Sequence, residues 1–287
     1  MSRPNLFKTL AVGGTTVWLA VFALLPFLLI VGVSVLARDP SSFVAPSFSL
    51  EGYASIADQG FLRIFLDSLW WAAVTAAGCL VLAYPFAYGL AKLKTKRKNF
   101  FLLLIIIPFW TNSLIRTYAL IFIIKSQGLL NVALLSLGLI SEPLEILYTD
   151  SAVLVGLIYT LLPFMILPLY SSIEKLDPCH LEAAKDLGAG RLRAFWEVTL
   201  PLTWPGILAG TMLTFLPALG MFYVPDVLGG AKSMLIGNFI KNQFLTARDW
   251  PTGSAASVVL TLIMALLLAF YSGSTKGRPS QPEDLGA

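Results

Sequence analysis

Three residues near the end of a long apolar run have the chemistry to bind an organic cation: Phe222, Tyr223 and Asp226. Aromatic faces attract an ammonium group, and a carboxylate pairs with the same group. A ligand that carries an ammonium group on an alkyl chain would use both kinds of contact. A plain turn is the alternative for Asp226, because Gly229 and Gly230 follow it closely.

A second set of polar groups interrupts an aliphatic stretch earlier in the chain, at Trp110, Asn112 and Arg116. Polar groups at membrane depth are costly and often mark transport pathways. We predict that Trp110 and Asn112 line such a pathway, with simple packing as the alternative for Trp110. Arg116 would lie about 24 Å along a helix that begins at Phe100. We therefore expect it to reach the far membrane interface or to pair with a carboxylate there. It would repel a cation and is not predicted as a ligand.

Other kinds of chemistry lack the residues that they require. The sequence has one histidine, His180, and two cysteines, Cys79 and Cys179, which are too few for a metal cluster or a disulfide framework. A phosphate-binding loop of the form G-x-x-x-x-G-K-[ST] does not occur, since the nearest stretch, residues 229–233, lacks its spacing. We predict no catalysis, no metal and no nucleotide bound by this chain. Any use of ATP then requires another subunit.

Membrane helices are the elements that must position these residues. Of the 287 residues, 57% are hydrophobic and 13% are charged, whereas soluble domains average about 45–50% and about 25%. A helix needs about 20 apolar residues to cross the hydrocarbon core. We therefore expect an all-α integral membrane protein with six transmembrane helices in one membrane domain, residues 12–271. The predicted spans are residues 12–36, 69–91, 101–124, 152–170, 202–224 and 255–271.

Lysine and arginine are distributed unequally between the two sides of these spans. One side holds 13 of them, in the N-terminus, the loop at 92–98, the polar stretch after the fourth span and the tail; the other side holds six. Cytoplasmic loops carry the excess of positive charge, so both termini are predicted to be cytoplasmic. Residues 1–11 then form a cytoplasmic N-terminus. Residues 272–287 form a polar cytoplasmic tail that we expect to be disordered.

The polar stretch after the fourth span begins with Asp177-Pro178, a pair typical of a helix start. Gly188 is typical of a helix end, because glycine adopts the left-handed conformation without a steric penalty. A second short helix is predicted over residues 191–199, and we expect Pro201 to end it. A solvated loop helix without a partner is the simplest interpretation of these signals alone.

The residues of this stretch resemble the EAA signature of permease subunits from ATP-binding-cassette (ABC) importers. The pattern EAA-x3-G-x9-I-x-LP is matched throughout, except that Val198 replaces the isoleucine. In that family the motif is a coupling helix that docks into a groove of the ATP-binding subunit. The resemblance implies a type I ABC-importer permease fold with a coupling region at residues 177–201. The residues that match, and that it assigns to ATPase coupling, are Glu182, Ala183, Ala184, Gly188, Leu200 and Pro201.

Longer stretches resemble PotB-type permeases of spermidine/putrescine importers over nearly the whole chain. This resemblance implies transport of polyamines into the cytoplasm across the bacterial plasma (inner) membrane. It also implies partners: two copies of an ATP-binding ABC subunit, which binds ATP and Mg, a second, related permease subunit, and a soluble substrate-binding protein. The stretches are PFWTNSLIRTYAL (108–120), LLPFMILPLYSSIEKLD (161–177), FYVPDVLGGAK (222–232) and LIGNFIKNQFL (235–245).

Two other functions remain as alternatives. An ABC permease for another small solute, such as an iron chelate or an opine-type compound, would keep the coupling motif and change only the cargo. A stand-alone secondary transporter would need coupling ions and would leave the EAA pattern without a role. The net charge of +4 does not indicate nucleic-acid binding, because cytoplasmic loops of membrane proteins are basic.

Overall fold

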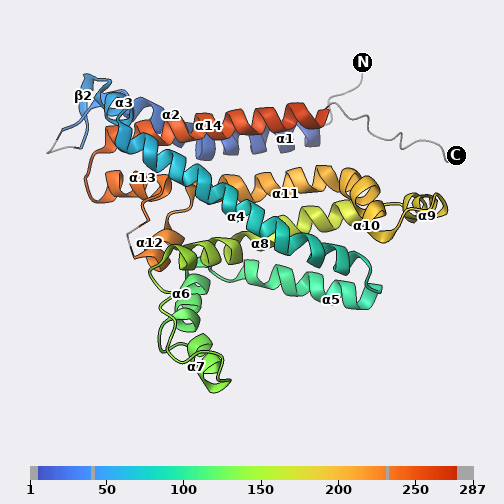
Figure 1. Ribbon diagram of the computed structural model, residues 1–287. Coiled ribbons are helices and arrows are strands. Elements are labelled where there is room, and N and C mark those ends of the chain that lie inside the picture. The colour runs from blue at the N-terminus through green and yellow to red at the C-terminus, as the bar shows by residue number, and fades with distance from the viewer. Residues whose placement is uncertain (1–5, 40–42, 231–232, 277–287) are drawn as a thin grey trace, which may run out of the picture. The chain divides into compact units, whose positions relative to one another are not determined.

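The computed structural model describes residues 6–39, 43–230 and 233–276, which are mostly helical (Figure 1). Among these residues, six helices are long and apolar enough to cross a membrane, which confirms the predicted all-α membrane fold. Residues 1–5 of the predicted N-terminus, Lys232 and residues 277–287 of the predicted tail lie outside the described residues. The six candidate spans are Leu10–Val33, Gln59–Ala91, Ser113–Ser136, Asp150–Glu174, Arg191–Gly220 and Trp250–Gly273.

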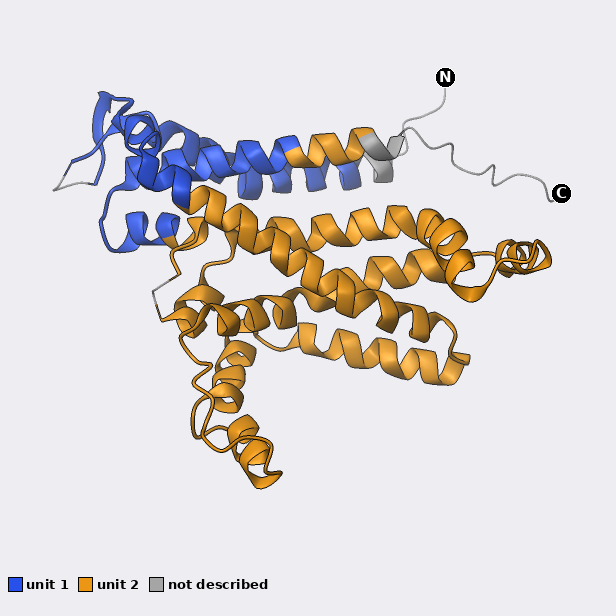
Figure 2. Ribbon diagram, in the orientation of Figure 1, with its two compact units in different colours: residues 1–63, 239–266 blue, residues 64–238, 267–287 orange. Residues whose placement is uncertain are grey.

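The chain divides into two compact units, residues 1–63 with 239–266 (unit 1) and residues 64–238 with 267–287 (unit 2) (Figure 2). Helices α4 (Gln59–Ala91), α13 (Ile236–Leu245) and α14 (Trp250–Lys276) contribute to both. Unit 1 otherwise contains α1 (Leu6–Leu19), the π-helix η1 (Ala20–Leu24), α2 (Leu25–Val33), β1 (Leu36–Ala37), β2 (Ala45–Phe48) and α3 (Glu51–Ile56). Unit 2 otherwise contains α5 (Thr95–Ile106), the 3-10 helix η2 (Ile107–Trp110), α6 (Ser113–Ile124), α7 (Leu129–Ser136), α8 (Asp150–Glu174), α9 (Pro178–Asp186), α10 (Arg191–Ala194), the π-helix η3 (Phe195–Thr199), α11 (Leu200–Gly220) and α12 (Tyr223–Gly229).

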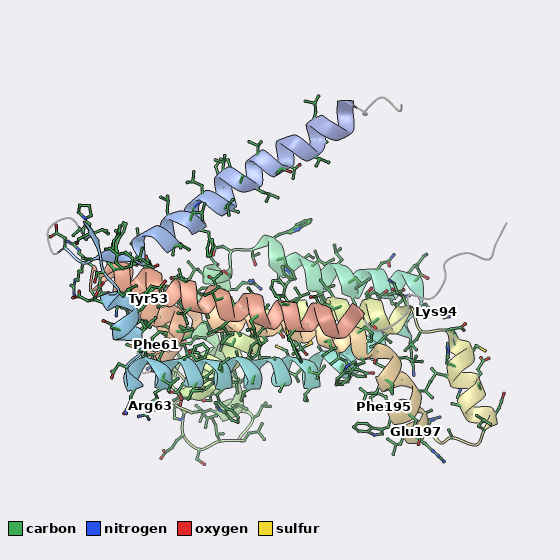
Figure 3. The ribbon with its side chains drawn as sticks, turned by 90° about the horizontal axis from the view of Figure 1, so that it is seen from above. Tyr53, Phe61, Arg63, Lys94, Phe195 and Glu197 are labelled. Atoms are coloured by element: carbon green, nitrogen blue, oxygen red, sulfur yellow. The ribbon has the colours of Figure 1, made fainter. Side chains whose placement is uncertain are left out.

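Unit 1 is held together by polar contacts around a short hairpin. Strands β1 and β2 pair antiparallel, and the hydroxyls of Ser34 and Tyr53 share a hydrogen bond of 2.9 Å. The guanidinium of Arg38 donates to the carbonyl of Ala247 at 2.9 Å and lies 3.6 Å from the carboxylate of Asp249. These contacts connect the segment between α2 and α4, where Figure 3 labels Tyr53, to the loop before α14.

Helices α8 and α11 pack against each other in unit 2 at unusually close range. A Cβ atom added to Gly206 would lie 2.4 Å from Cβ of Ser172, and one added to Gly210 would lie 2.6 Å from Sδ of Met165. Only glycine allows the helix backbone to approach this closely. Although α11 contains Pro205, it runs without interruption to Gly220. Its glycines therefore serve helix packing and do not break the helix.

The prediction of one helix across residues 101–124 is wrong. Helix α5 passes into η2, where Pro108 has no amide hydrogen to continue the helical pattern. The side chain of Asn112 accepts a hydrogen bond from the backbone amide of Leu114 at 2.8 Å and so caps a new helix, α6. Figure 1 shows α6 turning away from the direction of α5. The third candidate span is accordingly Ser113–Ser136.

Candidate coupling region and substrate pathway

The coupling region begins with the helix start that the sequence predicts. A carboxylate oxygen of Asp177 accepts a hydrogen bond from the amide of Cys179 at 2.9 Å, and Pro178 occupies the first helical position. The carboxylate satisfies one of the amides left unpaired at a helix start, and proline has no amide to leave unpaired. Local chemistry alone therefore explains where α9 begins.

The end of α9 is also as predicted, at Gly188. This residue has φ of +80°, a left-handed conformation that glycine adopts at little cost. Its amide donates to the carbonyl of Lys185 at 2.8 Å, and the amide of Ala189 donates to the carbonyl of Ala184 at 2.9 Å. These two bonds form a Schellman motif, which satisfies the last carbonyls of the helix. The motif turns the chain sharply between α9 and α10.

The second helix begins at Arg191 as predicted, but the prediction that Pro201 ends it is wrong. The residues from Arg191 to Gly220 form one continuous helical span. A π-helical turn, η3, bridges α10 and α11, and the amide of Leu200 donates to the carbonyl of Phe195. This wider turn precedes Pro201 and carries the helix past a residue that would clash in a regular α-helix. The coupling region is thus built directly onto the membrane helix α11.

The residues of the EAA pattern differ in their exposure. Glu182, Ala183 and Pro201 are exposed, whereas Leu200 is partly buried. Ala184 is only 8% exposed, so of the two alanines of the pattern only Ala183 is exposed. Another protein could therefore contact the exposed residues Glu182, Ala183 and Pro201.

Large apolar side chains are exposed in the same region. Leu187, Leu192 and Trp196 are exposed by 88%, 78% and 64%. Arg193 forms a two-pronged salt bridge with Glu197 on the next helical turn, with both distances 3.0 Å. Apolar groups surrounded by charged ones are typical of a protein–protein contact surface.

Aromatic packing attaches the coupling region to α4. The ring of Phe195 meets the ring of Tyr84 edge-on, with 5.5 Å between centroids, and that of Tyr88 at 6.4 Å. The hydroxyls of Tyr84 and Thr203 share a hydrogen bond of 2.9 Å, and Nζ of Lys92 lies 3.9 Å above the ring of Tyr88. A displacement of η3 would therefore act on α4 and α11 together. The sequence alone did not indicate this contact.

The basic loop at 92–98 lies at the same end of unit 2 as the coupling region, as Figure 3 shows for Lys94, Phe195 and Glu197. Lys98 in this segment forms a salt bridge of 2.7 Å with Glu174, the last residue of α8. The structure thus gathers the loop and the coupling region, which the charge count assigned to one side of the membrane.

The cation-binding candidates Phe222, Tyr223 and Asp226 lie together at the start of α12. The rings of Phe222 and Tyr223 are perpendicular, with centroids 6.1 Å apart, and Phe222 is 42% exposed. Asn238 donates a hydrogen bond to the Asp226 carboxylate and another, of 2.9 Å, to the carbonyl of Phe222. Asn238 is buried and orients this carboxylate. Sequence reasoning missed it, because no local signal pairs residues on two different helices.

The structure does not bring all the predicted pathway residues together. Trp110 is 82% exposed and, with Asn112, precedes α6. Tyr223 instead packs against a core cluster that includes Ile124, the last residue of α6. A helix of this length separates its ends by about 18 Å. Asn112 caps a helix, and the sequence-based role of Trp110 and Asn112 in a pathway stays a prediction.

Comparison with known proteins defines the class. Residues 82–276 match the family model described as "Binding-protein-dependent transport system inner membrane component", and the chain belongs to this family of ABC transporter permeases. It is therefore a multi-pass inner-membrane permease subunit with a role in transport, and its family works with an ATPase subunit and a substrate-binding protein.

Individual relatives give a more specific similarity than the family model does. The chain is 51% identical over 271 residues to the spermidine/putrescine transport system permease protein PotB of Salmonella typhimurium, covering 94% of each chain. It is 53% identical over 254 residues to PotB of Escherichia coli, covering 88% of this chain and 92% of the relative. A crystal structure of a bacterial ABC transporter that imports alginate superimposes with a TM-score of 0.73, covering 96% of this chain and 100% of the other. At 15% identity, that structure indicates a shared fold.

Proposed function

We propose that the chain is one of two permease subunits of an ABC importer that moves spermidine and putrescine into the cytoplasm. The observation that carries this proposal is the identity of 51–53% to spermidine/putrescine permeases, which extends over most of both chains. The four sequence stretches that resemble PotB-type permeases lie within the aligned region. The aromatic and carboxylate groups at the start of α12 have the chemistry that such a cargo requires.

The coupling region would dock on an ATPase subunit, which binds ATP and Mg in place of this chain. Glu182, Gly188 and the exposed apolar side chains of Leu187, Leu192 and Trp196 would form the contact. One chain offers one coupling region, whereas ATP hydrolysis by ABC subunits involves a pair of them. The transporter would therefore contain two ATPase copies and a second, related permease chain.

Closure of the ATPase pair would move the docked coupling region, and η3 with it. Because Phe195 packs against Tyr84 and Tyr88, and η3 continues into α11, this movement would tilt α4 and α11. Tightly packed helices transmit such displacements well, since their interiors are close-packed. The pathway between them would then alternate between openings on the two sides of the membrane.

The two sides follow from the charge distribution. The basic loop at 92–98 and the coupling region would face the cytoplasm, together with both termini. A soluble binding protein would deliver the polyamine to the opposite side. There, Phe222, Tyr223 and Asp226 would receive an ammonium group, with Trp110 and Asn112 as further pathway residues.

The test is uptake of labelled spermidine into vesicles that contain this chain with its second permease, ATPase and binding protein. Unlabelled putrescine should compete, whereas amino acids and iron chelates should not. Asp226→Asn should lower uptake while ATP hydrolysis by the complex continues, and Asp58→Asn, a change at an exposed carboxylate, serves as the control. Lack of competition by polyamines would reject the cargo, and equal loss of uptake and hydrolysis would reject the role of Asp226.

A further inference from the structure

A cavity of about 260 Å³ in unit 2 has one charged residue in its wall, Arg116. The rest of the lining is apolar or aromatic and comes from α4, α5, η2 and α8, with Phe86, Ile105, Tyr159 and Ile166 among its members. Arginine stays protonated in proteins. The cavity therefore presents a permanent positive charge against an apolar surface.

This charge lies beside the middle of α8. The residues of α8 that line the cavity fall between Tyr159 and Ile166, and α8 runs from Asp150 to Glu174. The nearer end of the helix is then roughly 12–14 Å away, at 1.5 Å per residue. Because the chain breaks before α6, Arg116 lies in the first turn of that helix. The single helix from Phe100 on which the expected interface position rested is therefore not formed.

The described part of the chain offers this arginine no counter-charge. Its Nε atom is buried without a hydrogen-bond partner, and no ion pair joins its guanidinium to a described carboxylate. The carboxylates of α8 are engaged at its ends, Asp150 with the hydroxyl of Ser233 and Glu174 with Lys98. An arginine at the centre of the bilayer costs about 2.5–3.5 kcal/mol or more unless it is compensated. The anion must therefore come from outside the described part of this chain.

The position of the cavity selects among the available anions. Lipid phosphates lie about 15 Å from the bilayer centre, beyond the hydrocarbon core, and a polyamine cargo is itself positive. A carboxylate on another membrane helix can reach the same depth. Leu82 and Tyr159, in the cavity wall, are exposed by 53% and 44% on this subunit, so another helix can pack at the mouth of the cavity.

We propose that Arg116 pairs with an aspartate or glutamate of the second permease subunit and that this ion pair determines which permease chain is accepted as partner. The proposal rests on the second permease chain of the proposed function. In a desolvated interface a complementary charge suppresses wrong partners.

The test is recovery of the second permease subunit with an affinity-tagged copy of this chain after co-expression with the ATPase and reconstitution in lipid nanodiscs. Arg116→Gln should lower recovery at least tenfold, Arg116→Glu should abolish it, and Arg116→Lys, which keeps the charge, should retain most of it. Arg63→Gln is the control, because Arg63 is exposed on α4 and outside the cavity (Figure 3). Replacing the partner's intramembrane carboxylates one at a time with lysine should identify one that restores recovery with Arg116→Glu.

Three other results would overturn the proposed ion pair. Normal recovery with Arg116→Gln would overturn the proposal, whether or not transport is lost. Loss of recovery with Arg116→Glu that no partner lysine restores would also overturn it, since such a loss reflects misfolding. If the unmodified chain recovers no second permease, the two-permease architecture itself fails, and the ion pair fails with it. Uptake by this chain and its ATPase without a second permease would show that the two-permease architecture has failed, rather than the ion pair alone.

Discussion

Trp196 is the residue of the coupling region whose replacement has the largest expected effect on ATPase binding. It lies on η3, and 64% of its surface is exposed. A tryptophan side chain buries up to roughly 250 Å², so about 160 Å² is available to a partner. At about 25 cal/mol per Å², covering all of it would contribute about 4 kcal/mol. Central interface residues of this type often cost about 2 kcal/mol or more on truncation. We expect Trp196→Ala to weaken ATPase binding by about 2–4 kcal/mol, roughly 30-fold to 1,000-fold in Kd.

The measurement is a titration of labelled ATPase subunit onto the two permease chains in nanodiscs. Trp70→Ala provides a matched control, because Trp70 is 68% exposed and lies toward the start of α4. The coupling region contacts α4 near its other end, at Tyr84 and Tyr88. The control removes the same side chain from a surface of similar exposure, and its Kd should stay within a factor of two of the unmodified protein.

Two results would refute this reasoning. An unchanged Kd for Trp196→Ala would mean that the ATPase leaves η3 uncovered, and the docking surface would have to be sought elsewhere. Equal weakening by Trp196→Ala and Trp70→Ala would mean that loss of any exposed indole disturbs the membrane domain. The size of the difference between the two variants is therefore the decisive quantity.

Two further predictions concern glycines. Gly210→Leu should lower the free energy of unfolding by about 1–3 kcal/mol, because its Cβ would meet Sδ of Met165 at 2.6 Å. The measurement is the unfolding temperature in detergent, which should fall for Gly210→Leu but not for the control Gly89→Leu, where the added side chain meets open space. Equal shifts for the two variants would contradict the packing argument. Gly188→Val should lower ATP-coupled uptake but not membrane insertion, because φ of +80° strains a non-glycine residue by about 1–2 kcal/mol. Gly190→Val, at φ of −64°, is its control, and full uptake by Gly188→Val would contradict the prediction.

The features predicted well from sequence depend on neighbouring residues. The start of α9 requires only Asp177 and Pro178, and its end requires only Gly188, since capping satisfies backbone groups within a few residues. Membrane helices are predictable for a similar reason, because a long apolar run has no stable alternative in a bilayer. The continuation of the helix through Pro201 was mispredicted, because a π-helical turn just before it accommodates the ring.

The sequence by itself determined the class of protein, the approximate number of membrane helices, and the coupling motif with its caps, because composition and short-range hydrogen bonding decide these. Only the tertiary structure decided that Asn238 orients Asp226, that Phe195 connects the coupling region to α4, and that Arg116 lies beside the middle of α8. Each of these depends on which helices pack together, and packing joins residues far apart in the chain through shape and close contact. A polar residue in an apolar run therefore signals importance from sequence, but its partner becomes visible only in the folded chain.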